Sequence, residues 1–84
     1  MSKSTIYFFT TSGCHLCEQA YQMLDYFIKN DAEVAVKIDI KVTEIADNDQ
    51  LVEQYGIRIP VLKNSTSELG WPFELEELRL WLIQ

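Results

Sequence analysis

Residues 5–10 of the chain, T-I-Y-F-F-T, are apolar or β-branched almost throughout. A run without polar alternation is typical of a strand buried on both faces, as in a parallel or mixed sheet covered by helices. From Cys14 onward the pattern changes to helical spacing, with apolar side chains at Cys17, Ala20, Tyr21, Leu24 and Ile28. This spacing predicts a helix that begins at the first cysteine and runs to about Lys29.

Further elements are predicted along the rest of the chain. Residues 34–40, V-A-V-K-I-D-I, predict a second strand, which completes a strand–helix–strand unit with parallel pairing and a right-handed crossover. A second helix is capped by Asp47 or Asn48 and ends near Gly56, which stands at the position of a C′ glycine. Residues 59–63 predict a short strand, residues 64–66 a turn, and residues 67–69 an antiparallel return.

The last predicted helix begins at Phe73 or Glu74 and places Leu75, Leu78 and Leu82 on one face, with Trp81 beside them. The predicted order is therefore β-α-β-α-β-β-α. The chain has 84 residues, of which 48% are apolar, with 3 Gly and 2 Pro. Length and composition predict an ordinary globular protein with a single domain over residues 1–84, without repeats or a linker.

Charge and hydropathy exclude two classes of partner. The chain carries 13 acidic and 7 basic side chains, for a net charge of −6, and it has no cluster of Lys or Arg. Nucleic acid binding and polybasic membrane contact both require a cationic surface. No uninterrupted apolar run is longer than that of residues 6–9, which is too short for a transmembrane segment or for the apolar core of a signal peptide. We therefore expect a cytoplasmic protein, and we expect it to be a monomer.

The two cysteines, Cys14 and Cys17, form a C-x-x-C motif at the predicted start of the first helix. In a reducing compartment, this spacing favours catalysis or metal binding over a structural disulfide. Backbone N–H groups and the dipole of a helix N-terminus stabilise negative charge, so Cys14 is predicted to form the reactive thiolate. Cys17 lies one turn further on the apolar stripe and is predicted to be the more buried thiol, which resolves a mixed disulfide.

Other interpretations of these residues remain open. A zinc site requires four ligands, whereas the chain offers two cysteines with one histidine between them, so only a dimer sharing two pairs would complete it. His15 is either a solvated side chain or an imidazolium that favours the thiolate at Cys14. Pro60 is either a proline tolerated at the first residue of a strand or part of a substrate site, in which Ile59 offers backbone groups to an extended peptide.

Two motifs carry a resemblance to a known family: T-S-G-C-H-L-C at residues 11–17 and Y-G-I-R-I-P-V-L at residues 55–62. With these motifs and the order of its elements, the chain resembles the glutaredoxin-like branch of the thioredoxin superfamily, and more narrowly the small bacterial glutaredoxin-like proteins. The resemblance implies an α/β thioredoxin fold with a four-stranded mixed sheet. It also implies that Cys14 is the nucleophile, that Cys17 is the resolving thiol, and that Pro60 is cis and lies against the cysteine pair.

The chain also departs from the patterns of this superfamily. Gly13 and His15-Leu16 replace the Trp and Gly-Pro of thioredoxins, and the Pro-Tyr of glutaredoxins is absent. The Thr-Val-Pro glutathione contact of glutaredoxins is replaced by residues 58–60, and their Gly-Gly contact by residues 69–72. These departures argue against glutathione binding, and no cofactor is expected. Arg58 is a candidate partner for a glutathione carboxylate or, equally, for a weak surface ion pair.

The leading hypothesis is a dithiol oxidoreductase that exchanges with a disulfide-containing protein or a small thiol. Its catalytic residues are Cys14 and Cys17, and its predicted substrate-binding residues are Gly13, His15, Arg58, Ile59 and Pro60. The alternative is a thioredoxin-like binding module in which the cysteines are vestigial or regulatory. The loss of the recognisable glutathione and thioredoxin contact residues favours this second hypothesis.

Overall fold

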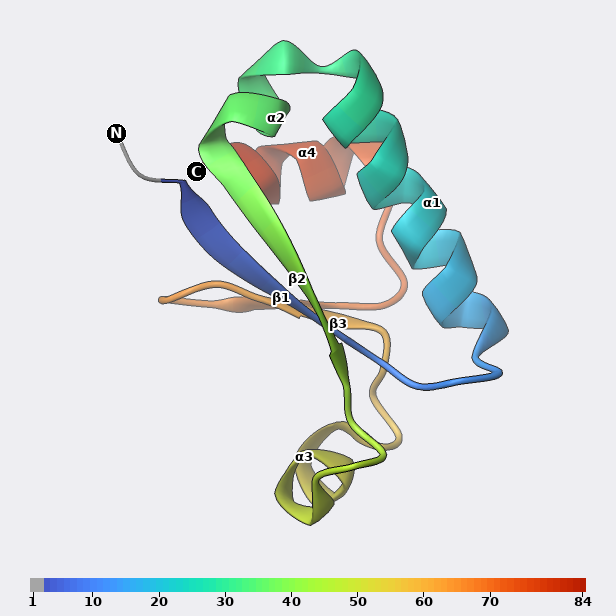
Figure 1. Ribbon diagram of the computed structural model, residues 1–84. Coiled ribbons are helices and arrows are strands. Elements are labelled where there is room, and N and C mark those ends of the chain that lie inside the picture. Colours follow the sequence, from blue (N-terminus) through green and yellow to red (C-terminus); the bar gives the residue numbers. More distant parts are fainter. Residues whose placement is uncertain (1–2) are drawn as a thin grey trace.

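A mixed sheet of four strands forms the centre of the structure, a computed structural model that describes residues 3–84 (Figure 1). The strand order is β2-β1-β3-β4, with bounds β1 (Ser4–Thr10), β2 (Ile38–Glu44), β3 (Val61–Lys63) and β4 (Glu68–Gly70). β1 and β2 pair in parallel, whereas β3 pairs antiparallel with both β1 and β4. The predicted α/β class with a four-stranded mixed sheet is confirmed.

Helices cover the two faces of the sheet unequally. In Figure 1, α1 (His15–Asn30), α2 (Ala32–Lys37) and α4 (Leu75–Ile83) lie together, whereas α3 (Asp49–Tyr55) lies apart from them. Neighbouring residues of β1 point to opposite faces, so Ile6 and Phe8 join the larger core cluster, and Phe9 joins a smaller cluster with Tyr55 of α3. Tyr7 stays 39% exposed. The predicted burial of β1 on both faces therefore holds at Ile6, Phe8 and Phe9, whereas Thr5 and Tyr7 are exposed.

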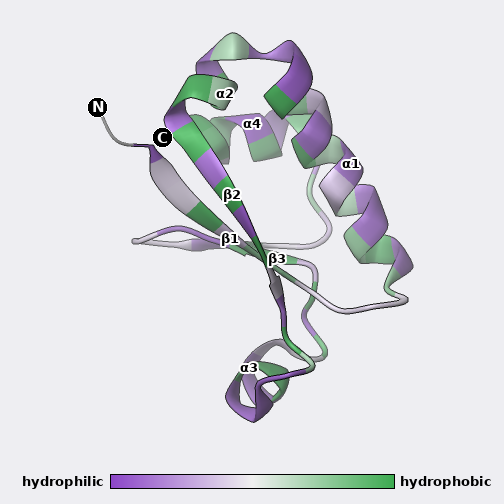
Figure 2. Cartoon of the chain, in the orientation of Figure 1, coloured by the Kyte–Doolittle hydropathy of each residue, from purple (hydrophilic) through white to green (hydrophobic). Residues whose placement is uncertain are grey.

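The apolar stripe of α1 packs against β1 and α4. Its buried members are Cys17, Ala20, Leu24 and Phe27, whereas Tyr21 and Ile28 are exposed. Figure 2 shows hydrophobic and hydrophilic stretches alternating along α1, as expected of a helix with one buried face. Within residues 3–84, no helix is both long enough and apolar enough to cross a membrane.

The prediction of a strand over residues 34–40 is wrong for its first half, which forms the short helix α2. Asp31 causes this difference: its Oδ1 accepts hydrogen bonds from the N–H groups of Glu33 and Val34 and so caps a new helix directly after α1. Val34 is buried, whereas Val36 is 66% exposed. The strand begins only at Ile38, where the parallel pairing with β1 starts. The observed order therefore contains one helix more than predicted.

Smaller differences occur in the second half of the chain. Asn48, one of the two predicted caps, caps α3 with its side-chain oxygen. Gly56 has the right-handed φ of −52° rather than the left-handed conformation of a C′ glycine, and a Cβ there would lie 2.5 Å from the Val52 carbonyl oxygen. β3 begins at Val61, two residues later than predicted, and Leu75 is exposed while Leu78 is buried.

Candidate active site

The loop between β1 and α1 places Cys14 at the start of the helix. Gly13 has a φ of +80°, a left-handed conformation that a residue with a Cβ adopts only with strain. It is followed by Cys14, whose extended backbone makes it the N-cap of α1. The chain thus turns from strand to helix within a few residues, and the predicted position of the first cysteine at the helix start is confirmed.

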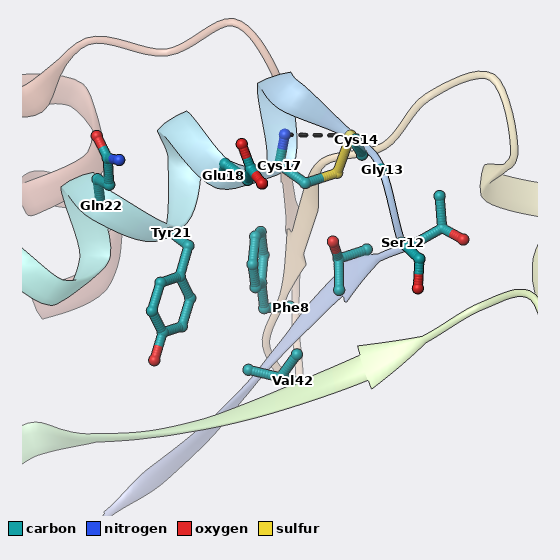
Figure 3. A pocket seen from close by; sticks show the side chains of 11 residues that line it. Phe8, Ser12, Gly13, Cys14, Cys17, Glu18, Tyr21, Gln22 and Val42 are labelled. Atoms are coloured by element: carbon teal, nitrogen blue, oxygen red, sulfur yellow. Dashed lines mark hydrogen bonds between the residues drawn. A yellow bond between two sulfur atoms is a disulfide. The ribbon is translucent and has the colours of Figure 1, made fainter.

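Cys14 and Cys17 are joined in a disulfide, and their Cα atoms are 5.2 Å apart. The backbone N–H of Cys17 donates a hydrogen bond to the Cys14 sulfur over 3.1 Å, drawn as the dashed line in Figure 3. A sulfur that is only a weak acceptor in a disulfide becomes a strong one as a thiolate. This N–H and the helix dipole are therefore aimed at the atom that would carry negative charge after reduction.

The two cysteines differ in their accessibility. Cys17 is 3% exposed and belongs to the larger core cluster, whereas Cys14 is half-buried at the edge of that cluster. The predicted contrast in burial is therefore confirmed. A reagent from solvent can reach the disulfide at Cys14 far more easily than at Cys17.

A pocket of about 600 Å³ opens beside the disulfide, between α1 and β2 (Figure 3). Phe8, Tyr21 and Val42 supply apolar surface to it, and the Phe8 and Tyr21 rings stack with centroids 6.0 Å apart. The loop before the disulfide contributes Thr11, Ser12 and Gly13. The complete lining is Phe8, Thr10, Thr11, Ser12, Gly13, Cys14, Cys17, Glu18, Tyr21, Gln22 and Val42.

Glu44, at the end of β2, holds this loop, a role that was not among the predictions from the sequence. One carboxylate oxygen accepts hydrogen bonds from the backbone N–H of Ser12 (3.1 Å) and from its hydroxyl (3.4 Å), and the other accepts from the N–H of Ala46 (3.0 Å). The bond from Ala46, one from the Thr11 side chain and those from Ser12 hold the pKa of Glu44 below its ordinary value. The parallel register pairs Glu44 with Thr10, a contact that no local sequence pattern reveals.

His15 and Arg58, two of the predicted substrate-binding residues, differ in their surroundings. The side chain of His15 is 91% exposed, and its Nδ1 lies 3.6 Å from a carboxylate oxygen of Glu18, one turn along α1. Arg58 does not line the pocket. It pairs with Glu68 over 2.7 Å, and its guanidinium lies 5.0 Å from the centre of the Tyr55 ring. His15 adjoins Cys14 in the chain, but neither His15 nor Arg58 lines the pocket beside the disulfide.

Ile59 and Pro60 connect α3 to β3. The bond between them is cis, as the family resemblance implies, and Pro60 is fully buried. Ile59 packs against both core clusters, and its N–H donates to the Tyr55 carbonyl over 3.0 Å. An added peptide strand would therefore find this N–H already engaged. Neither residue lines the pocket beside the disulfide.

Comparison with known proteins shows which family and which solved structures this chain is similar to. A family model described as Glutaredoxin-like domain (DUF836) matches residues 5–83. The solved structure of protein XcR50 from X. campestris matches at 33% identity with a TM-score of 0.73, over 92% of this chain and 93% of that chain. Protein Ne2328 from Nitrosomonas europaea shares the fold at 23% identity, with a TM-score of 0.73 over 96% and 93% of the two chains. No curated protein matches the chain.

Proposed function

Because the chain belongs to the glutaredoxin-like family of the thioredoxin superfamily, we propose that it is a thiol–disulfide oxidoreductase working through Cys14 and Cys17. One observation carries this proposal: the two residues form a disulfide at the first turn of α1, with the Cys17 N–H directed at the Cys14 sulfur. This environment is of the kind that lowers the pKa of a thiol and makes it nucleophilic at neutral pH.

The reaction proceeds from the reduced form in two exchanges. The Cys14 thiolate attacks one sulfur of a substrate disulfide, forms a mixed disulfide and releases the other substrate sulfur as a thiolate. The Cys17 sulfur, once it has lost its proton, then attacks the Cys14 sulfur and releases the remaining substrate thiolate. Two electrons pass from the protein to the substrate, and the protein is left with the Cys14–Cys17 disulfide. A dithiol, or two molecules of a thiol, must reduce that disulfide before the next cycle.

The proposed substrate is a disulfide of a protein or of a small thiol, which approaches Cys14 from the exposed side of the loop. Gly13 lines the pocket there, and the exposed His15 follows the nucleophile directly. Because the N–H of Ile59 already donates to Tyr55, an added strand would pair with the Ile59 carbonyl instead. Arg58 is left out of the proposed site, since Glu68 neutralises it.

The test is the reduction potential of the cysteine couple, measured by equilibrating the protein with mixtures of reduced and oxidised glutathione. A reversible value between about −120 and −270 mV is expected, the range of working oxidoreductases. The variant Cys14→Ser keeps a single thiol and serves as the control, because it cannot form the intramolecular disulfide.

The opposite result would favour the alternative function. A value below about −300 mV, or the absence of reversible exchange, is typical of a structural disulfide. The chain would then be a thioredoxin-like binding module with a redox-inert cysteine pair. Two observations support this alternative: the N–H of Ile59 is already hydrogen-bonded, and Arg58 is already paired with Glu68.

A further inference from the structure

The described side chains that line the pocket beside the disulfide carry a negative charge and no positive one. Among the described residues that line it, Glu18 is the one charged side chain, and none is Lys or Arg. Glu18 follows Cys17 on α1, and its side chain is 70% exposed (Figure 3). A substrate group bound next to the Cys14 sulfur therefore meets this carboxylate and no Lys or Arg of the described lining. The basic side chain beside Glu18 is that of His15, whose Nδ1 lies 3.6 Å from the carboxylate and which points to solvent with 91% of its side chain exposed.

A second carboxylate, that of Glu44, is bonded to one of the residues that line the pocket. Glu44 accepts hydrogen bonds from both the backbone and the hydroxyl of Ser12, which itself lines the pocket. These bonds hold the pKa of Glu44 below its ordinary value, so that the carboxylate stays charged at neutral pH. Glu18 thus lines the pocket from α1, and Glu44 is bonded to a residue that lines it from the loop.

The two arginines of the chain are paired with carboxylates outside the pocket lining. Arg58 pairs with Glu68, and Arg79 pairs with both Asp31 and Glu33. On β2, Lys41 directly precedes the pocket residue Val42, and successive strand side chains point to opposite faces of a sheet. Lys41 is therefore directed away from the pocket. The local charge near the disulfide has the same sign as the net charge of −6.

From this arrangement we propose that the pocket selects disulfides whose entering half carries a positive charge close to the sulfur, as in a basic peptide, and disfavours anionic disulfides. This inference rests on the proposed function. The exposed faces of Tyr21 and Val42 would pack against the methylene groups that separate the charge from the sulfur, and Glu18 would pair with the cationic end. Glutathione disulfide, with its excess of carboxylates, would react more slowly, which leaves the equilibrium potential of the cysteine couple unchanged.

The experiment compares three small disulfides of similar size: cystamine, a cation; hydroxyethyl disulfide, which is neutral; and dithiodipropionate, an anion. Each oxidises the reduced protein, which loses two electrons to form the Cys14–Cys17 disulfide while the probe is cleaved to two thiols. The rate constant for loss of the protein thiols is measured at low ionic strength. Dividing it by the rate constant of the same probe with mercaptoethanol removes the intrinsic reactivity of each probe.

We expect the normalised rate to fall from cystamine to the neutral probe to the anion, by roughly two- to fivefold at each step. Salt at about 1 M shortens the screening length to about 3 Å and should bring the three rates together. The variant Glu18→Gln should lower the preference for cystamine by about twofold or more. Glu53→Gln, on the exposed side of α3, changes the net charge by the same amount and should leave the preference in place.

The possible outcomes separate the two proposals. Equal normalised rates for the three probes, or an equal effect of Glu18→Gln and Glu53→Gln, would overturn the inference about substrate charge and leave the oxidoreductase function standing. If the reduced protein reacts with none of the probes faster than mercaptoethanol does, both proposals fall. A preference that Glu18→Gln weakens and Glu53→Gln does not would support both.

Discussion

At the scale of single residues, Cys14 and Cys17 share a disulfide but have different surroundings. The variant Cys17→Ser leaves Cys14 as the single thiol. We expect the rate at which iodoacetamide alkylates it to rise with pH around a midpoint below the ordinary thiol pKa of about 8.5. The reason is the position of its sulfur at the N-terminus of α1. The measurement is the alkylation rate as a function of pH.

The matched variant Cys14→Ser leaves only Cys17, which is 3% exposed. Its alkylation should be slower than that of the lone Cys14 at every pH, because the reagent reaches the sulfur only after a local opening. Equal rates for the two variants, or a midpoint for Cys14 near that of a free thiol, would contradict the assignment of Cys14 as the nucleophile.

Glu44 provides the second prediction at this scale. Its folded-state pKa lies below the ordinary 4.5, so it contributes stability that is fully present above that value and is lost as the pH falls through the folded pKa. The variant Glu44→Gln lacks a titrating carboxylate at this position. We therefore expect the gap in urea midpoint between wild type and variant to be largest near neutral pH and to shrink below pH 4.5.

Other carboxylates titrate in the same range, so the difference between the two proteins is the informative quantity. Asp31 and Glu68 also have lowered pKa values, through their arginine and tyrosine partners, but they are unchanged in both proteins. A gap that stays constant from neutral to acidic pH would show that the Glu44 charge does not stabilise the loop. The sequence could not reveal this residue, since its partners Thr11 and Ser12 are more than thirty positions away.

At the scale of elements, capping residues decide where helices begin. The sequence left the cap of α3 open between Asp47 and Asn48, and the structure assigns it to Asn48, whose Oδ1 accepts from the N–H groups of Gln50 and Leu51. We expect Asn48→Ala to lower the free energy of unfolding by about 1 kcal/mol. Asn48→Asp should retain most of the stability, because the carboxylate also accepts these bonds. Urea denaturation measures both.

Asp47→Ala is the matched control, since it removes the other predicted cap. It should change the free energy of unfolding by less than about 0.5 kcal/mol, as is usual for a surface substitution. If Asp47→Ala destabilises the protein as much as Asn48→Ala, the helix begins one residue earlier than Asp49. Capping also explains why α2 was not predicted. Its β-branched residues favour a strand, but the side chain of Asp31 caps a helix there.

At the scale of the whole molecule, the succession of strands along the chain and the position of the cysteine pair could be predicted, because hydrophobic periodicity reports on burial and the C-x-x-C motif is local. The predicted glutaredoxin-like fold is confirmed by the family match over residues 5–83. Hydrophobic periodicity could not indicate how far the helices cover each face of the sheet. Tyr7 lies on a strand with no polar alternation, yet it stays exposed, which a pattern along one strand cannot indicate.

The packing of α4 tests this view of the core. Sequence spacing placed Leu75, Leu78 and Leu82 on one face, but the structure buries only the last two, with Leu78 fully enclosed in the cluster that contains Phe8 and Leu24. Leu78→Ala should therefore cost about 2–5 kcal/mol, the lost burial plus the cavity left behind. Leu75→Ala removes the same atoms from a 47% exposed site in the first turn and should cost less than about 1 kcal/mol.

Because a small domain has a free energy of unfolding of only about 5–15 kcal/mol, the Leu78 variant would lose a large share of it. Urea denaturation followed by tryptophan fluorescence suits this comparison, since Trp81 lies on the same helix and belongs to the same cluster. Similar losses for the two leucines would mean that α4 is rotated relative to its position in this structure. The larger core, which also holds Cys17, would then be packed differently around the disulfide.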